Sequence, residues 1–172
     1  MQPLLHFTVP FVAATLLGLK PKKAFVVSLF ALVPDLDVLF HVHRSMSHSL
    51  LMLLLISVPF ILWTKNSKFH EYALLGSVMV GSHLVFDLFT NYTPILWPLY
   101  GNSLWVAIEG FTHVGSYPTI DLGVRVLTAP VSFAQLQSFD AQLFTGEGFI
   151  ASAFLLALSF SKIILKGLRK SA

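Results

Sequence analysis

Long apolar runs separated by short polar stretches dominate the pattern along this chain. The hydrocarbon core of a bilayer is about 30 Å thick, so a helix needs about 20 apolar residues to cross it. Each run must be helical, because no water in that core can satisfy free backbone groups. The pattern predicts an all-α polytopic membrane protein with about five transmembrane helices in one membrane-embedded domain. The expected spans cover residues 4–19, 24–40, 49–63, 72–90 and 149–165 of a domain that runs from 1 to 172.

The segment 91–148 carries polar, aromatic, Pro and Gly residues between the last two expected spans. It is too long for a plain connection between helices. We expect it to form re-entrant or interfacial helices that cap the outer face.

Composition supports a membrane protein and also indicates its orientation. The chain is 55% hydrophobic and 11% charged, whereas a soluble domain carries about a quarter charged residues. When the spans alternate, all of the 11 Lys and Arg except Arg44 and Arg125 fall on one side. Basic residues concentrate on the cytoplasmic side, so we expect a multi-pass protein with its amino terminus outside and its carboxyl terminus cytoplasmic. This distribution forms no basic stripe, which argues against a nucleic-acid partner.

Ionisable residues inside the predicted spans are costly and by default mark a functional site. With a helical rise of 1.5 Å per residue, they lie roughly 18 to 26 Å above the cytoplasmic border. The residues at this common depth are His6, Asp35, His48, His83 and Asp87. The chain contains no Cys, so any metal in this layer must bind His and carboxylate groups.

Two short motifs carry most of this chemistry. His83 and Asp87 are four residues apart, which puts imidazole and carboxylate on one helical face; the alternative is a His–Asp hydrogen bond that joins two helices. Asp35 and Asp37 follow Pro34, and both reach one site only if the backbone loosens there. Otherwise one of them binds the metal and the other supports a metal ligand, or the pair forms a polar helix end.

The turn between the second and third expected spans is rich in His, a composition typical of metal sites. His48 opens the third span and is our preferred ligand in this turn. Arg44 is a candidate catalytic residue that clamps a phosphate or carboxylate oxygen; alternatively, it pairs with Asp35 or Asp37. His43 is a second catalytic candidate, as a proton carrier, although an interfacial polar residue is the simpler interpretation.

At these residues the sequence resembles the YdjM-like family, described as inner-membrane metal-dependent hydrolases. The resemblance covers roughly residues 1–100. Its elements are an N-terminal His (His6), Pro-Asp-x-Asp (Asp35, Asp37), His-Arg-x-x-x-His-Ser (His43, Arg44, His48, Ser49) and His-x-x-x-Asp-x-x-Thr followed by Trp-Pro (His83, Asp87, Thr90, Trp97, Pro98). The ligand order is also similar to that of zinc-dependent phospholipase C and P1-type nucleases, but a later His-x-x-x-Glu pair is not evident. The resemblance therefore implies one or two ions and not a three-metal cluster.

Together these features predict an inner-membrane, metal-dependent hydrolase that cleaves a phosphoester of a lipid or lipid-linked substrate with metal-activated water. One ion is expected on His48, His83, Asp87 and Asp35. His6 shares Asp87 or Asp37 with a possible second ion. Zn²⁺ suits these donors best, with Mn²⁺ or Fe²⁺ as alternatives. The rival classes are a divalent-metal transporter or sensor without hydrolysis, and a scaffold whose His and Asp residues only join helices.

Overall fold

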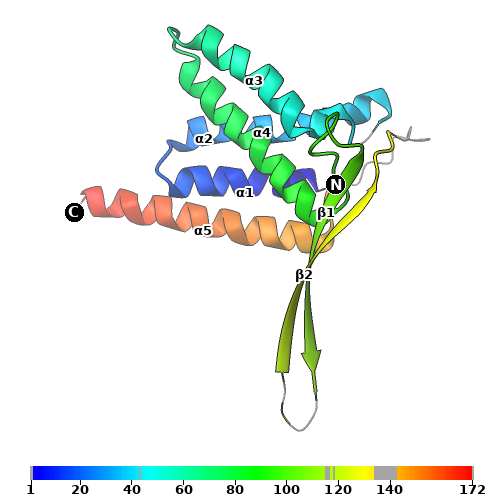
Figure 1. Ribbon diagram of the computed structural model, residues 1–172. Helices are drawn as coiled ribbons and strands as arrows, with labels where there is room; N and C mark the ends of the chain where they lie inside the picture. The colour runs from blue at the N-terminus through cyan, green and yellow to red at the C-terminus, as the bar shows by residue number, and fades with distance from the viewer. Residues whose placement is uncertain (1, 43, 115–116, 118, 134–142, 172) are drawn as a thin grey trace.

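The computed structural model describes residues 2–42, 44–114, 117, 119–133 and 143–171. The elements, with η for 3-10 helices, are α1 (Pro3–Leu16), α2 (Pro21–Ser28), η1 (Leu29–Leu32), η2 (Pro34–Phe40), η3 (Met46–His48), α3 (Leu50–Thr64), α4 (His70–Thr90), β1 (Asn102–His113), β2 (Thr119–Pro130) and α5 (Gly146–Ser171). Helix α5 runs alongside α1, and α3 and α4 form a hairpin whose loop points away from both (Figure 1). The strands project from the opposite end of this helical hairpin.

The expected set of five full-length spans is wrong. Among the described residues, one helix is long and apolar enough to cross a membrane: α4, with 21 residues and a mean hydropathy of 1.5. Helices α1 and α3 and the stretch Gly146–Ser161 of α5 are apolar but shorter. The apolar runs do form helices, but local signals end several of them early.

One such signal ends α1. Gly18 takes a left-handed conformation with φ of 101°, which glycine adopts without steric cost. The N–H of Leu19 donates to the carbonyl of Ala14 and that of Gly18 to Thr15, at 3.0 and 3.1 Å. This pair of hydrogen bonds is a Schellman motif that closes the helix, and Pro21 then starts α2 in the first turn, where proline is favoured.

The expected span 24–40 is not one α-helix. Helix α2 ends at Ser28, and the chain continues as the 3-10 helices η1 and η2. Pro34 stands in the first turn of η2, where its missing N–H and its ring oppose continuation of an α-helix. Asp35 and Asp37 therefore lie on a 3-10 turn, and both side chains are buried.

The expected helical cap is instead largely an antiparallel β-hairpin. Strands β1 and β2 pair in register from Asn102 opposite Pro130 to His113 opposite Thr119. In β2 the apolar residues at 120, 122, 124 and 126 alternate with Asp121, Gly123 and Arg125, and this period of two is typical of a strand. The hairpin extends away from the helices (Figure 1), which leaves these apolar side chains exposed.

Small apolar residues let α1, α2, η1 and α4 approach closely, because short side chains allow backbones to come together. The buried core consists of Phe11, Val12, Ala14, Ala24, Val27, Ala31 and Met79. This packing holds the first turns of α1, the turn η2 and the carboxyl-terminal half of α4 at one end of the molecule. All the candidate ligands lie at that end.

Candidate metal centre

The structure brings together five of the residues that the sequence singled out. His6 comes from the first turns of α1, Asp35 from η2, His48 from the end of η3, and His83 and Asp87 from α4. Each of these side chains is buried, and His48 and His83 are 0% exposed. Such burial of polar groups is costly unless they are paired or bind a metal.

Four atoms at the centre lie at close and similar separations. His48 Nε2 is 3.2 Å from His83 Nε2, 3.3 Å from Asp87 Oδ2 and 3.7 Å from Asp35 Oδ1. His83 Nε2 is 3.6 Å from Asp35 Oδ1 and 3.7 Å from Asp87 Oδ2. In a four-coordinate site with bonds of about 2.0 to 2.2 Å, the ligand atoms lie about 3.3 to 3.6 Å apart. These separations fit a divalent ion held by His48, His83 and Asp87, whose ligand atoms all lie within 4.8 Å of one another, with Asp35 beside the two imidazoles.

Asp35 supplies an independent sign that the protein alone leaves this site incomplete. Both of its carboxylate oxygens are buried, and neither has a hydrogen-bond partner. A carboxylate in such surroundings is normally paired, hydrogen-bonded or bound to a metal. The buried His and Asp groups therefore form a site that fits a cation.

His6 stands beside this centre and extends it. Its Nε2 is 3.3 Å from Asp87 Oδ1, the carboxylate oxygen that faces away from His48 and His83. The His6 ring stacks on the His83 ring with the centroids 4.1 Å apart. His6, Asp35 and His83 form a second group whose ligand atoms lie within 4.8 Å of one another. Of the two expected carboxylate partners of His6, Asp87 is the one in contact.

Asp37 lies behind His48 and not among the four central atoms. Its Oδ2 is 3.3 Å from His48 Nδ1 and accepts a hydrogen bond of 2.9 Å from the Ser45 N–H. The Ser47 hydroxyl lies 3.0 Å from both Asp37 Oδ2 and His48 Nδ1. A carboxylate on the second ring nitrogen orients a metal-binding imidazole. The structure therefore places Asp35 beside the central imidazole nitrogens and Asp37 behind His48.

Sequence reasoning missed Ser45 and Ser47. Ser45 caps η3 by accepting a hydrogen bond from the Ser47 N–H, and this local turn places both residues on Asp37. The signal that identifies them is a Ser-x-Ser sequence directly before His48, because serine often caps the first turn of a helix.

Arg44 reaches the centre from one side. It pairs with Asp87 at 3.3 Å, and not with Asp35 or Asp37 as one interpretation had it. The guanidinium also donates to the Thr90 hydroxyl at 3.3 Å and to the Tyr92 carbonyl at 2.9 Å. The backbone of Arg44 has a φ of 57°, a conformation that costs a residue other than glycine about 1 to 3 kcal/mol and often marks a functional site.

The charge of His48 reflects its surroundings in the metal-free protein. Burial by itself lowers the pKa of this imidazole, but the carboxylates of Asp35, Asp37 and Asp87 raise it to about 10. His48 is therefore a cation at neutral pH, and it partly balances these three carboxylates.

Other candidates lie elsewhere or outside the described residues. His43, the expected proton carrier, falls outside them. His113 and Asp121 contact each other at 3.1 Å on the exposed hairpin. A cavity of about 460 Å³ between α1, α4 and the segment before α5 borders the centre directly, because His6 and Thr90 line it.

The described residues thus include one helix long and apolar enough to cross a membrane and buried His and Asp groups that could hold a metal ion. Residues 1–168 match the YdjM inner membrane protein family, and the chain belongs to this family. The resemblance to that family is thereby confirmed over nearly the whole chain, and an inner-membrane location follows. The similarity to hydrolases and zinc-dependent phospholipases stays a prediction. No curated protein and no solved structure matches the chain.

Proposed function

We propose that this protein is a metal-dependent phosphoesterase of the inner membrane that acts on a lipid or lipid-linked phosphate. The observation that carries the proposal is Asp35, a buried carboxylate without hydrogen bonds that faces two imidazoles. A scaffold that only joins helices would satisfy its polar groups within the protein. Zn²⁺ is our preferred ion, since imidazole and carboxylate groups are ligands that it binds well.

Each residue around the centre has a role in this proposal. A divalent ion held by Asp35, His48, His83 and Asp87 would take a water molecule as a fifth ligand, lower the pKa of that water to about 7 and offer a positive charge to a phosphoryl oxygen. Asp37 fixes the orientation of the His48 ring.

Arg44 would bind the phosphate, since its guanidinium is planar and presents several donors to an oxyanion. Thr90 and Asp87 hold that guanidinium beside the centre. The cavity of about 460 Å³ that His6 and Thr90 line is large enough for the head group of a small phosphoester. We place this end of the protein at the outer face of the membrane, because most of the basic residues lie toward the other end.

The experiment presents phospholipids, prenyl phosphates and a generic phosphodiester to purified protein loaded with Zn²⁺ or Mn²⁺. We expect hydrolysis that a chelator abolishes and that Asp87→Asn removes. His70→Ala is the matched control, because His70 begins the same helix α4 at its other end, and it should retain near-normal activity. Protein that binds metal and cleaves none of these substrates, but carries Zn²⁺ or Mn²⁺ across liposomes, would replace this proposal with the transporter class.

A further inference from the structure

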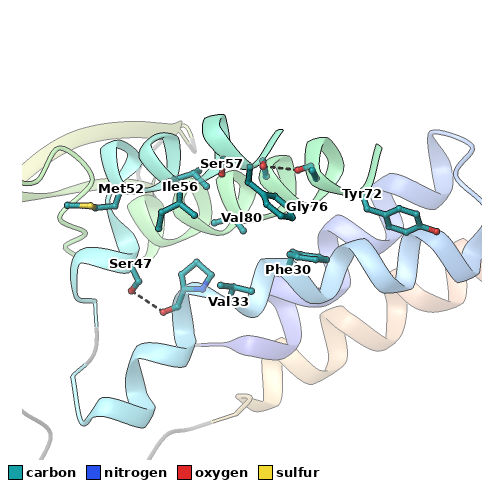
Figure 2. Close-up of a pocket in the computed structure, with 14 residues that line it drawn as sticks. Phe30, Val33, Ser47, Met52, Ile56, Ser57, Tyr72, Gly76 and Val80 are labelled. Carbon is teal, nitrogen blue, oxygen red and sulfur yellow. Dashed lines mark hydrogen bonds between the residues drawn. The ribbon is translucent and has the colours of Figure 1, made fainter. Parts of the chain in front are cut away.

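An apolar groove lies between α3, α4 and the 3-10 helices, outside the centre described above. Its volume is about 290 Å³, near the lower end of the range for small-molecule sites. Figure 2 shows Phe30 and Val33 on one side of it, facing Ile56 and Val80 on the other. It contains almost no polar surface: Ser77, for example, donates its hydroxyl to the carbonyl of Ala73 in its own helix at 2.8 Å.

Gly76 shapes the groove where α4 passes Phe30. A Cβ atom at this position would lie 3.1 Å from the Phe30 ring, closer than ordinary van der Waals contact. The absence of a side chain lets this ring lie flat against the helix and leaves the space beside it open.

One end of the groove reaches Ser47, which contacts His48 on the side of its ring that faces away from the central atoms. Ser47 and Pro34 line that end, and the Ser47 hydroxyl lies 3.1 Å from the Pro34 carbonyl, as Figure 2 shows. The same hydroxyl is 3.0 Å from His48 Nδ1. Tyr72 lines the other end, and the stretch of α4 from Tyr72 to Val80 is about 12 Å long at 1.5 Å per residue. The groove is thus elongated and mostly apolar, with the hydroxyls of Ser57, Ser77 and Tyr72 along it and that of Ser47 at the end beside His48.

The groove also opens to the lipid-facing surface of the protein. Ile56 and Val33 line it and are 70% and 45% exposed, and the neighbouring Leu55 on α3 is 65% exposed. In a protein of the inner membrane these side chains contact lipid. The groove is therefore continuous with an interface that hydrocarbon chains already cover.

We propose that this groove binds one hydrocarbon chain of a phosphate-ester lipid whose phosphate lies at the metal centre. The inference rests on the proposed function for the position of the phosphate, and it adds the part of the substrate that the groove recognises. The elongated shape of the groove and its mostly apolar lining match such a chain. Both acyl and prenyl chains have this chemistry.

The test labels detergent-purified, full-length protein with two probes that carry a photoreactive group at the far end of the chain. One probe is palmitoyl lysophosphatidic acid and the other is farnesyl phosphate. We expect labelled peptides to map to residues 52–60 of α3 or 72–80 of α4. Stronger labelling by one probe assigns the groove to an acyl or to a prenyl chain. Labelling that maps elsewhere for both probes would overturn the proposal.

Two matched variants give the test its specificity. Ile56→Trp puts an indole ring into the space that the chain would occupy, so labelling should fall at least about fivefold. Leu55→Trp makes the same change on the adjacent exposed position of α3, outside the groove, and labelling should stay near the wild-type level. Both positions are exposed, so both variants should fold, which equal metal content would verify. Equal labelling of the two variants would show that lipid merely coats the surface, and the proposal would fail.

This test is separate from the proposed function, because labelling requires no turnover. Protein that hydrolyses a short-chain phosphodiester but shows no groove-specific labelling would leave the hydrolase intact and refute the groove. Groove-specific labelling without any hydrolysis would support the groove and refute the hydrolase. Where both hold, Ile56→Trp should raise KM for long-chain substrates and leave the short-chain phosphodiester unaffected.

Discussion

Replacing Asp35 by Asn is expected to change the stability of this protein in opposite directions with and without a divalent ion. In the metal-free protein the carboxylate of Asp35 is buried and accepts no hydrogen bond, and it faces the His48 and His83 rings at 3.7 and 3.6 Å. Asp87 and Asp37 have closer partners in Arg44, His6, Ser45 and His48. A buried group left unsatisfied costs about 1 to 3 kcal/mol, and more when it is charged. Asp35→Asn should therefore raise Tm in the presence of a chelator, by about 2 to 4 °C for each kcal/mol relieved in a chain of this size.

With metal present, Asp35→Asn should lower Tm relative to the wild type. An ion at 100 times its Kd stabilises the folded protein by about 2.7 kcal/mol. Loss of a direct ligand should weaken binding by at least the 10- to 100-fold that loss of a supporting residue causes. Most of that stabilisation then disappears in Asp35→Asn. Thermal unfolding of detergent-purified protein, followed by intrinsic fluorescence with chelator or with excess Zn²⁺, should show the two melting curves in opposite order.

Asp37→Asn is the matched control for this experiment. Asp37 accepts a hydrogen bond from Ser45 and contacts His48, so its loss should lower Tm both with chelator and with metal. Asp37→Asn should melt below the wild type in the presence of chelator. If Asp35→Asn also melts below the wild type there, Asp35 is not a preformed metal ligand. An unchanged metal-induced rise in Tm in Asp35→Asn would show the same.

The remaining predictions concern charge, pH and orientation. Arg44→Ala should retain metal but slow turnover at least about a hundredfold, because a preorganised donor to the developing charge is lost. Arg44→Lys should recover little of this rate, because an ammonium lacks the planar fork of donors. Normal turnover in Arg44→Ala would remove Arg44 from the proposal. Metal must displace a proton from His48, whose pKa is about 10 without metal. The metal affinity, measured by competition with a chelator dye, should therefore fall about tenfold for each unit that the pH is lowered below 10. A metal affinity that does not change with pH would contradict the protonated state of His48. Cysteines at Met46 and Ser67, both on exposed positions, should be labelled by a membrane-impermeant thiol reagent from opposite sides, with Met46 reached from outside; labelling of both from one side would overturn the proposed orientation.

Local patterns in the sequence predicted several of the apolar helices and the gathering of the buried His and Asp side chains. Apolar runs and helical rise are properties of neighbouring residues, so they placed His6, His48, His83 and Asp87 at one level before any packing was known. The spacing of His83 and Asp87 likewise predicted that their side chains share a helical face, and in the structure they lie 3.7 Å apart.

Other local signals were present but were outweighed in the interpretation. The alternation from Ile120 to Val126 is a strand pattern, yet the length and aromatic content of its segment favoured an interfacial helix. Pro34 marked a break in the run 24–40, but total apolarity favoured one span. In both places the local backbone preference predicted the observed structure, and the average hydrophobicity of the segment did not.

The sequence by itself determined the class of this protein, its apolar helices and the set of side chains able to bind a metal, because hydrophobicity and donor chemistry belong to individual residues. Only the tertiary structure decided which aspartate faces the centre, that Arg44 pairs with Asp87, and that an apolar groove ends beside His48. These features depend on the relative position of η2, η3 and α4, which are separated along the chain. No periodicity encodes such distances, since they arise from how the helices pack.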